Sequence, residues 1–379
     1  MKYFDYAATT PMSDVALETY TTVSRRYFAN TNSLHDLGSN ASQLLEQCKF
    51  HLAKLMNCKS DQLFFTKGGS EANILGVQTL LKNHLVGKHV IVSMAEHNSI
   101  IQTCEYLKQL GYDISYLEFN STGQVDLLEL ESYIREDTAL VIVQHVNGEI
   151  GTIQPIEEIA NLCRQHHIFL HMDSVQSFGR MDLSQVTPLV DSISVSSHKI
   201  YGPKGMGLLY LKDAQNNGVE ALLLRGNTMD LASIASFVTA AYEMIEQMDS
   251  EMKRMNELRK IFFHHLVEIS DLLTVYENLN GNQIPSIIGM GIHGIEGQWV
   301  MLECNRNGFA ISTGSACDVK YNKITNTLKA LSIPPEKARE FFRISIGKDT
   351  SEEDMIELAQ FLVKMTLDFK TESGIEIRR

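Results

Sequence analysis

A lysine with small neighbours lies between a strand-like run and a glycine-rich turn, in the segment 196–205 (SSHKIYGPKG). Small side chains beside Lys199 let a bulky ligand approach the backbone. Partial burial keeps an amine neutral and able to form an imine with a carbonyl compound. The same segment contains Lys204, whose place between proline and glycine predicts a solvated turn. We therefore expect Lys199 to be the reactive amine, against the plain alternative of a surface lysine before a loop.

A glycine turn followed by a predicted helix lies in the segment 64–73 (FFTKGGSEAN). Free backbone N–H groups at a helix N-terminus bind phosphate, and glycine lets the phosphate come close. The hydroxyl of Ser70 adds a donor, so Gly69 and Ser70 are candidate phosphate ligands. The alternative is an ordinary N-terminal cap, which is common in proteins.

A carboxylate follows directly after an apolar run in the segment 169–176 (FLHMDSVQ). Because ligands bind at the carboxyl ends of parallel strands, Asp173 is placed to pair with a protonated pyridine nitrogen, which makes such a ring an electron sink. Gln176 lies three residues later and is a candidate partner for a phenolic oxygen of the same ring. The alternative for Asp173 is a cap on the next helix.

A histidine and an arginine complete the polar candidates. His97 follows a strand-like run, where its imidazole can stack on a ring and move protons; the chain has 13 histidines, so this position alone says little. Arg343 lies in the apolar segment 341–347 (FFRISIG). A buried arginine needs a partner, and a substrate carboxylate suits its fork geometry. The alternative is a structural ion pair with one of the many acids.

One of the six cysteines stands in a run of very small residues, in the segment 311–318 (ISTGSACD). Such a run predicts a loop that exposes the thiol of Cys317, and a reactive thiol needs both access and thiolate character. The other five cysteines lie in helix-like or apolar stretches and are expected in the core. No two cysteines form a CxxC pair, so the sequence predicts neither a zinc site nor a thioredoxin-type motif.

Short apolar runs alternate with amphipathic stretches between residues 63 and 211. The runs predict strands at 89–93, 113–118, 139–145, 168–172, 192–196 and 207–211, and the other stretches predict helices at 100–110, 127–135 and 156–166. His97, Asp173 and Lys199 each follow one of these strands. The order predicts an α/β fold in which helices cover both faces of a largely parallel sheet.

The length of 379 residues exceeds what one hydrophobic core usually supports, so we expect two lobes. A long helical stretch from about 230 to 270 is predicted to link them. From about residue 273 the pattern indicates a smaller α+β unit, which the N-terminal arm is expected to join. The predicted division is a large domain at 16–250 and a small domain, carrying the cysteine loop, formed by 1–15 and 251–379.

The formal net charge is −13, and an acidic chain repels both phosphate backbones and anionic lipids. We therefore expect no direct binding of nucleic acid and no membrane association. No apolar run approaches the roughly 20 residues that span a bilayer. The first residues, MKYFDYAATTP, lack the apolar core of a signal peptide, so a cytoplasmic location is expected.

Taken together, these segments resemble the group I cysteine desulfurases, the NifS/IscS type within the class V aminotransferase family. The matching segments, in family order, are FDYAATTP (4–11), NTNSLHDLG (30–38), EIGTIQPI (149–156), SSHKIYGPKG (196–205), STGSAC (312–317) and RISIG (343–347). A single motif of this kind is weak, but several in register along nearly the whole chain are specific.

The resemblance implies a fold-type I transferase dependent on pyridoxal 5′-phosphate (PLP). Its large α/β domain would hold a mostly parallel, seven-stranded sheet, beside a smaller α+β domain. It implies a homodimer that converts L-cysteine to L-alanine and passes the sulfur to a persulfide on Cys317 and then to an acceptor protein. No metal is implied, although Cys317 could transiently ligate an iron–sulfur cluster with a partner. The acceptor stays open among iron–sulfur scaffolds, tRNA-thiolating enzymes and a dedicated partner enzyme.

The resemblance also assigns roles to the candidate residues. Lys199 would carry PLP, and Asp173, Gln176 and His97 would contact the nitrogen, the phenolic oxygen and the face of its ring. The predicted phosphate and cofactor ligands are the backbone of Gly69 and the side chains of Ser70, Ser196, Ser197 and His198. Thr228, in the segment RGNT, would reach the phosphate of the neighbouring subunit. Arg343 would bind the substrate carboxylate, and Cys317 would attack the substrate sulfur.

Two positions depart from the family pattern. The family reads NNEIG where this chain has Gly148 after Asn147, so an amide that contacts cofactor and substrate is missing. The family's glycine-rich segment before the threonine motif is also absent, since residues 221–224 (ALLL) run directly into Arg225. We therefore expect a slow enzyme that needs a partner for useful turnover.

Two alternative functions stay open at this point. The first is another class V PLP enzyme, such as a transaminase or a selenocysteine lyase; a transaminase needs no exposed cysteine, so Cys317 discriminates against it. The second is a weakened family member that serves as a sulfur carrier or binding protein. The departure at Gly148 motivates it, whereas the presence of Lys199, Asp173 and Cys317 argues against it.

Overall fold

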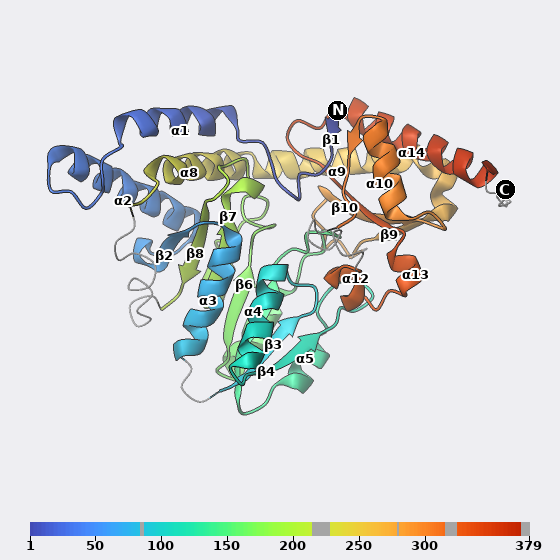
Figure 1. Ribbon diagram of the computed structural model, residues 1–379. Helices are drawn as coiled ribbons and strands as arrows, with labels where there is room; N and C mark the ends of the chain where they lie inside the picture. The colour runs from blue at the N-terminus through green and yellow to red at the C-terminus, as the bar shows by residue number, and fades with distance from the viewer. Residues whose placement is uncertain (84–86, 214–227, 279, 315–323, 373–379) are drawn as a thin grey trace.

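A seven-stranded sheet lies at the centre of the computed structural model, which describes residues 1–83, 87–213, 228–278, 280–314 and 324–372 (Figure 1). In spatial order its strands are β2 (Leu63–Thr66), β8 (Gly207–Leu211), β7 (Ser192–Ser196), β6 (Phe169–Asp173), β5 (Thr138–Gln144), β3 (His89–Ser93) and β4 (Asp113–Leu117). Strand β8 pairs antiparallel with β2 and β7, and the other pairings are parallel. The predicted mostly parallel sheet is confirmed.

Helices surround this sheet and form much of the rest of the chain. Their bounds are α1 (Asp14–Arg26), α2 (Asp36–Met56), α3 (Gly69–Asn83), α4 (Asn98–Gln109), α5 (Leu127–Tyr133), α6 (Ile156–Gln165), α8 (Leu231–Glu246), α9 (Met248–His265), α10 (Gly297–Arg306), α12 (Asn326–Ala330), α13 (Pro335–Ala338) and α14 (Glu352–Glu372). In the part of the chain that the structure describes, none of the helices is both long and apolar enough to cross a membrane.

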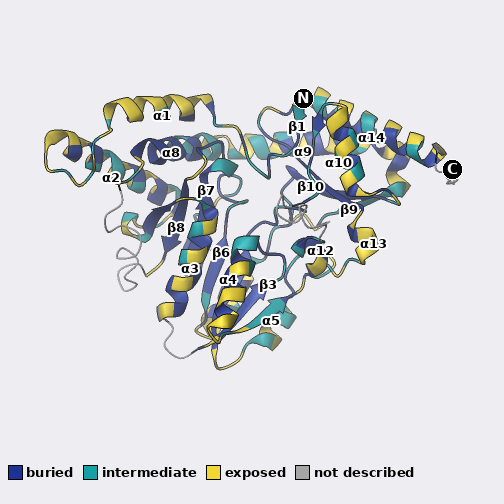
Figure 2. Cartoon of the chain, viewed as in Figure 1, coloured by how far each residue is buried: buried dark blue, intermediate teal, exposed yellow. Residues whose placement is uncertain are grey.

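The central strand β5 shows why the sheet is covered on both faces. Every residue of β5 is buried, and side chains alternate across a strand. Leu140 and Ile142 join a cluster with residues of α3 and α4, whereas Val141 and Val143 join the larger cluster that includes residues of α2, α6 and α8. Figure 2 shows the strands as buried and the outer sides of α3 and α4 as exposed.

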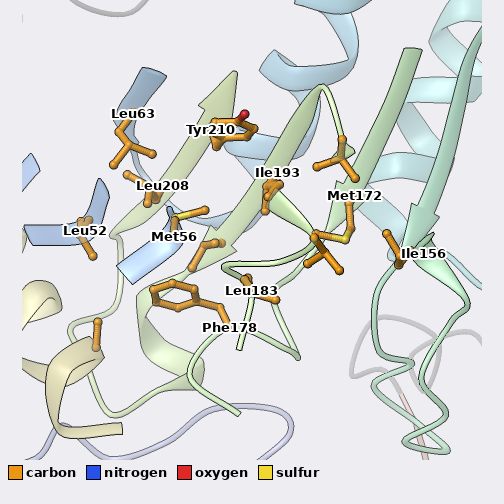
Figure 3. Close-up of a cluster of buried hydrophobic side chains, with 14 of the residues drawn as sticks. Leu52, Met56, Leu63, Ile156, Met172, Phe178, Leu183, Ile193, Leu208 and Tyr210 are labelled. Atoms are coloured by element: carbon orange, nitrogen blue, oxygen red, sulfur yellow. The ribbon is translucent and has the colours of Figure 1, made fainter. Parts of the chain in front are cut away.

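The larger cluster joins helices distant in sequence to one face of the sheet (Figure 3). Its labelled members include Leu52 and Met56 of α2, Met172, Ile193 and Leu208 of the sheet, and Phe178. Burying such side chains is worth about 1.5–3 kcal/mol each. The sheet that carries Asp173 and Lys199 at its strand ends is thereby held as a stiff platform.

A second hydrophobic cluster belongs to the C-terminal part of the chain. It includes Phe262, Ile288, Phe342 and Leu358, which lie on α9, β10 (Ile287–Ile292), β12 (Phe341–Ser345) and α14. Strand β10 is antiparallel to both β12 and β9 (Leu273–Tyr276). This cluster is separate from those on the two faces of the sheet, and the division into domains at 15/16 and 250/251 stays a prediction.

The N-terminal arm lies against this C-terminal unit. Strand β1 (Lys2–Tyr3) is parallel to β11 (Phe309–Ala310), and Asp5 bridges to Ser345 at the end of β12. Figure 1 shows the N-terminus beside α14. The arm continues from there toward the sheet, where Thr10 donates its backbone N–H to the carbonyl of His198 at 2.9 Å.

The helical stretch predicted at 230–270 is two helices. Helix α8 ends at Glu246 and α9 begins at Met248, with Gln247 between them, and a short 3-10 helix, η4 (Val267–Leu272), follows. Residues of α8 pack into the larger cluster, whereas Met255, Leu258 and Phe262 of α9 pack into the second one. The break lets each helix turn its apolar side to a different core, which periodicity alone does not reveal.

Candidate active site

A cavity of about 340 Å³ lies where the strand ends of the sheet meet the N-terminal arm and the C-terminal unit. Its lining includes nine of the predicted residues: Gly69, Ser70, His97, Asp173, Gln176, Ser196, His198, Lys199 and Arg343. These residues come from segments up to 274 positions apart, from Gly69 to Arg343. The structure therefore gathers most of the candidates into one site.

The amine of Lys199 lies inside this cavity. Its Nζ donates to the backbone carbonyls of Ala7 and Ala8, at 2.6 and 2.9 Å. Burial lowers the pKa of Lys199 to about 7, with help from the charges of Arg343 and Arg180. A large share of the amine is therefore neutral at pH 7, as imine formation requires. Lys204 lies exposed in the turn and outside the lining.

The carboxylate of Asp173 ends strand β6 and is only 6% exposed. Its Oδ1 accepts the backbone N–H of Val175 at 2.9 Å, but the residues that follow form a turn and not a helix, so the alternative of a helix cap at Asp173 is wrong. Its Oδ2 accepts from Nδ2 of Asn73 at 2.8 Å. Two hydrogen bonds thus fix the orientation of a carboxylate that lines the cavity, where it could pair with a protonated ring nitrogen.

The imidazole of His97 caps helix α4. Its Nδ1 accepts the backbone N–H of Ser99 at 3.1 Å and lies 2.8 Å from the Ser99 hydroxyl. This cap explains why α4 begins at Asn98, two residues before the predicted start. A ring held by Nδ1 has a set orientation at the cavity wall, so the cap and the predicted stacking role are compatible.

The N-terminus of α3 packs closely against the sheet at Gly69. A Cβ atom there would lie 2.7 Å from Cγ2 of Val175 and 3.3 Å from Cβ of Ser196, so only glycine fits. Ser70 is exposed at the cavity, and Ser196 ends β7. The first N–H groups of the 15-residue helix and two hydroxyls thus face one end of the site.

His198 and Ser197 lie in the short 3-10 helix η3 (Ser197–Lys199). Nδ1 of His198 is 3.1 Å from the Thr9 hydroxyl. Burial, with the nearby charge of Lys199, lowers the pKa of His198 to about 4, so it is neutral at pH 7. Ser197 is fully buried against the turn at Gly202, whose added Cβ would lie 2.1 Å from the Ser197 hydroxyl. The structure does not bring Ser197 to the cavity lining.

The side chain of Gln176 is hydrogen-bonded to Arg180, a residue that was not predicted from the sequence. Its Oε1 accepts from Nη1 of Arg180 at 3.0 Å, and its Nε2 donates to the carbonyl of Ala7 at 2.9 Å. Arg180 also donates to the carbonyl of Lys199 at 3.1 Å. The sequence signal was a basic residue four positions after Gln176, and spacing does not show that this residue is partly buried against Gln176.

The guanidinium of Arg343 is buried, at 5% exposed, and lines the cavity. Its Nη2 pairs with Oδ1 of Asp5 at 2.6 Å, and its Nη1 donates to the carbonyl of Gly148 at 2.9 Å. Nε has no hydrogen-bond partner among the described residues. The structural ion pair that we set against a substrate role is therefore present, while the cation still faces the cavity.

Gly148 also lines the cavity, next to Gln176. A Cβ atom at Gly148 would lie 3.1 Å from Nε2 of Gln176. The amide of Asn147 does not replace the missing one, because its Nδ2 donates to Thr327 at 3.0 Å and its Oδ1 accepts the N–H groups of Glu149 and Ile150.

A buried acid, Glu96, was also missed. Its Oε1 accepts from the Ser93 hydroxyl and from the backbone N–H of Gln144, each at 2.7 Å, whereas Oε2 has no partner among the described residues. Burial raises the pKa of Glu96 to about 8, and the nearby charge of Asp173 adds to the rise. Glu96 is therefore mainly protonated at pH 7 and adds little negative charge beside Asp173.

Besides Ser197, two further predicted residues are not in the cavity lining. Thr228 is exposed, and its hydroxyl accepts from Nδ2 of Asn30 at 3.5 Å. Cys317 and the segment 221–224 lie outside the described residues, although Gly314, three positions before the cysteine, lines the cavity. Within the described ranges, no group of three or more His, Cys, Asp or Glu side chains is arranged to hold a metal ion.

The arrangement suits an anionic, aromatic carbonyl ligand. A partly neutral amine lies near a carboxylate at the end of β6, an imidazole stands at the wall, and N–H and hydroxyl donors of α3 and β7 face one end. The buried cation of Arg343 can receive a second carboxylate. Such a set favours chemistry at an amino acid bound through its amine.

Comparisons with known proteins agree with this description. The family model described as aminotransferase class-V matches residues 2–247 and 232–358. The chain is 35% identical, over 366 residues, to cysteine desulfurase IscS of Dictyoglomus turgidum, covering 93% of this chain and 91% of the relative. A solved NifS-like protein shares 27% identity with a TM-score of 0.87, over 97% of this chain and 99% of the other. SspA in complex with cysteine shares 30% identity with a TM-score of 0.77, over 91% and 99%.

Proposed function

Because this chain belongs to the class V aminotransferase family, we propose that it is a PLP-dependent cysteine desulfurase that converts L-cysteine to L-alanine and passes on the sulfur. The observation that carries the proposal is the amine of Lys199, whose pKa is lowered to about 7 inside the cavity that also contains Asp173. The similarity to a cysteine desulfurase over nearly the whole chain supports the substrate.

The residues present fit PLP. The donors at Gly69, Ser70, Ser196 and His198 would hold the phosphate, and Gly69 lacks the Cβ atom that would lie 2.7 Å from Cγ2 of Val175. Asp173, Gln176 and His97 would hold the ring, and Lys199 would bind it covalently. When bound, PLP supplies an electron sink for bonds at the substrate's α and β carbons.

The chain's own groups do the positioning and the proton transfer. Lys199 has a pKa near the working pH, so it can take and return a proton, as efficient acid–base catalysis requires. Arg343 would bind the substrate carboxylate in exchange for part of its contact with Asp5. Glu96, whose pKa is raised to about 8 by burial, is mainly protonated at pH 7 and can donate a proton at this wall.

Cys317 is the proposed sulfur acceptor on the enzyme. Its thiolate would attack the sulfur of the bound cysteine, the Cβ–S bond would break with its electron pair left on carbon, and protonation of that carbon would give alanine. The product on the enzyme is the Cys317 persulfide. The thiolate of a reduced acceptor then attacks the outer sulfur, which passes to the acceptor, and the Cys317 thiolate leaves. The acceptor protein's identity stays open.

A homodimer is part of the proposal. Thr228 lies outside its own chain's cavity, in contact with exposed Asn30, and would be available to a neighbouring subunit. Two large apolar side chains close to Asn30 in the sequence are exposed, Phe28 at 71% and Leu34 at 99%, and a second subunit would cover them if they lie in the proposed interface.

The test is incubation of the purified protein with PLP, L-cysteine and a reductant, with sulfide and alanine both quantified. Equal amounts of the two products are expected, and Lys199→Ala should give neither. Pyruvate in place of alanine, or conversion of the cofactor to its amine form without sulfide, would contradict the proposal and favour a lyase or a transaminase.

A further inference from the structure

Asn73 of helix α3 joins two of the proposed ring contacts. It is 1% exposed, and its Nδ2 donates to Oδ2 of Asp173 at 2.8 Å and to the hydroxyl of Ser99 at 3.1 Å. The same hydroxyl lies 2.8 Å from Nδ1 of His97. Asn73 therefore connects the carboxylate at the ring's edge with the imidazole at its face.

The other end of the amide is fixed as well. Oδ1 of Asn73 lies 3.1 Å from Nε2 of His171, and Nδ1 of His171 lies 2.9 Å from the Ser192 hydroxyl. Burial lowers the pKa of His171 to about 4, so the ring is neutral at pH 7. An amide oxygen only accepts, so Nε2 carries the proton and the Ser192 hydroxyl donates to Nδ1.

These contacts allow one orientation of the amide. Its oxygen faces His171, so both N–H groups must face Asp173 and Ser99. Ser99, which accepts from Asn73, then has its own O–H free to donate to Nδ1 of His97. The hydrogen bonds therefore run from Ser192 through His171 to Asn73, and from Asn73 both to Asp173 and through Ser99 to His97.

A glycine makes this chain of contacts possible. Gly76 lies one turn after Asn73 on α3, and a Cβ atom there would lie 2.6 Å from the Ser192 hydroxyl and 2.9 Å from Nδ1 of His171. Only glycine lets the helix approach β6 and β7 closely enough for Asn73 to reach His171 and Asp173 together.

We propose that Asn73 is a positioning residue that couples the orientation of Asp173 to that of His97 and thereby sets the protonation behaviour of the bound cofactor. This inference rests on the proposed function, because Asp173 and His97 act on PLP. Asn73 donates to the same carboxylate that would pair with the ring nitrogen, so loss of Asn73 changes the orientation of that carboxylate and its contact with the protonated nitrogen.

The experiment is a spectroscopic pH titration of the PLP-bound protein. Asn73→Ala should move the midpoint of the visible absorbance change by at least about half a pH unit and weaken PLP binding about tenfold, because charge-assisted hydrogen bonds are the stronger class. Gln78→Ala, an exposed position on the same helix, is the matched control and should leave both unchanged. Circular dichroism melting checks the fold of each variant.

The coupling itself is tested by Ser99→Ala and by the double variant. Ser99→Ala should shift the midpoint by less than Asn73→Ala, and it should add nothing in the Asn73→Ala background, because the path to His97 is already cut. Additive shifts, or an unchanged midpoint in Ser99→Ala, would overturn the coupling. If Asn73→Ala does not fold, the midpoint of Ser99→Ala alone tests the coupling, because an unchanged midpoint contradicts it.

The outcomes also separate this inference from the proposed function. If the unaltered protein binds PLP and releases sulfide but Asn73→Ala titrates as the unaltered protein does, the positioning role is wrong and the desulfurase function stands. If the unaltered protein binds no PLP, both are wrong.

Discussion

At the residue scale, the proposed chemistry depends on a lysine whose surroundings lower its pKa. Burial lowers the pKa of Lys199 from 10.5 to about 7, and the cations of Arg343 and Arg180 act in the same direction. Both arginines also make side-chain contacts, since Arg180 donates a hydrogen bond to Gln176 and Arg343 forms an ion pair with Asp5. The same guanidinium groups therefore hold neighbouring side chains and help to lower the pKa of Lys199.

The first prediction concerns the pH dependence of cofactor attachment. Only the neutral amine reacts, and its fraction rises with pH through the folded pKa. The rate at which PLP attaches to the ligand-free protein should therefore reach half its maximum near pH 7, followed by stopped-flow absorbance. Lys204→Arg should behave as the unaltered protein does. A midpoint near 10, or borohydride fixation of PLP on Lys204, would contradict the role of Lys199.

The lowered pKa also has a consequence for stability, with a definite sign. Between about pH 7 and 10.5 the unfolded chain holds a proton on Lys199 that the folded protein has released. The ligand-free protein should therefore become more stable as pH rises through this window. Lys199→Met should remove that part of the pH dependence in thermal melts.

The second prediction concerns Cys317. Cys317→Ala should still bind PLP and change its spectrum when L-cysteine is added, while persulfide and sulfide formation should vanish. Cys58→Ala is the control, because burial raises the pKa of that half-buried thiol to about 12 and leaves almost no thiolate. Normal turnover in Cys317→Ala would exclude the proposed sulfur transfer and favour a lyase or transaminase reading.

The third prediction tests the missing amide. Gly148→Asn should raise the rate of sulfide release by about tenfold or more, because a hydrogen bond to a charged group is worth about 1.5–3 kcal/mol. The new Cβ requires Gln176 to move by a few tenths of an ångström, since the two would lie 3.1 Å apart. Gly148→Ala introduces the same crowding without the amide and should bring no gain. Equal rates and spectra for the two variants would refute the argument from this position.

At the scale of elements, the site depends on how closely α3 lies on the sheet. Helix α3 presents Gly69 to β7 and Gly76 to Ser192 and His171, so two glycines remove side chains where the helix and the strands meet. The N-terminal arm completes the other wall, where Ala7 and Ala8 accept hydrogen bonds from Lys199. A shift of α3 or of the N-terminal arm by a few tenths of an ångström would therefore change the positions of the side chains in the cavity.

The fourth prediction is that Gly76→Ala lowers both stability and cofactor affinity. The added methyl group would lie 2.6 Å from the Ser192 hydroxyl, and overpacking of this kind costs about 1–3 kcal/mol. Chemical denaturation and PLP titration measure the two effects. Gly111→Ala is a contrasting variant: nothing lies within 4 Å of its Cβ, but its positive φ of 84° makes it a backbone-strain control. If only Gly111→Ala weakened PLP binding, close packing of α3 would not be the cause.

At the scale of the whole molecule, the cavity lies between two cores and takes residues from both. Lys199 and Asp173 lie on the platform of the central sheet, whereas Arg343 lies on β12 of the C-terminal unit. The geometry of the cavity therefore depends on how the C-terminal unit packs against the central sheet. The proposed second subunit extends this principle, because Thr228 lies outside its own chain's cavity.

The fifth prediction is a shared active site in a homodimer. Light scattering should give twice the mass of the chain. Lys199→Ala and Thr228→Val homodimers should each bind PLP poorly. A mixed dimer should regain one normal site, built from the lysine of one subunit and the threonine of the other. A monomer, or a mixed dimer without recovery, would contradict the role given to Thr228.

The sequence by itself determined the sheet, most of its strands and the positions of the main candidate residues. Hydrophobic runs and their polar ends depend on neighbours within a few residues, so the ends of β6 and β7 placed Asp173 and Ser196 correctly. Motifs in register along the chain likewise pointed to Lys199 and to the family. In contrast, local spacing gave no reason to break the helical stretch at Gln247.

Only the tertiary structure decided how these residues are partnered. Arg343 pairs with Asp5, 338 positions away, and Asn73 reaches Asp173 across 100 positions. Ser197, beside the reactive lysine in sequence, faces the turn at Gly202 and not the cavity. Such contacts depend on which side chains the packed cores bring within about 3 Å, and hydrogen bonds weaken steeply beyond that range. The spacing of residues in the sequence does not show which distant side chains come within hydrogen-bonding distance.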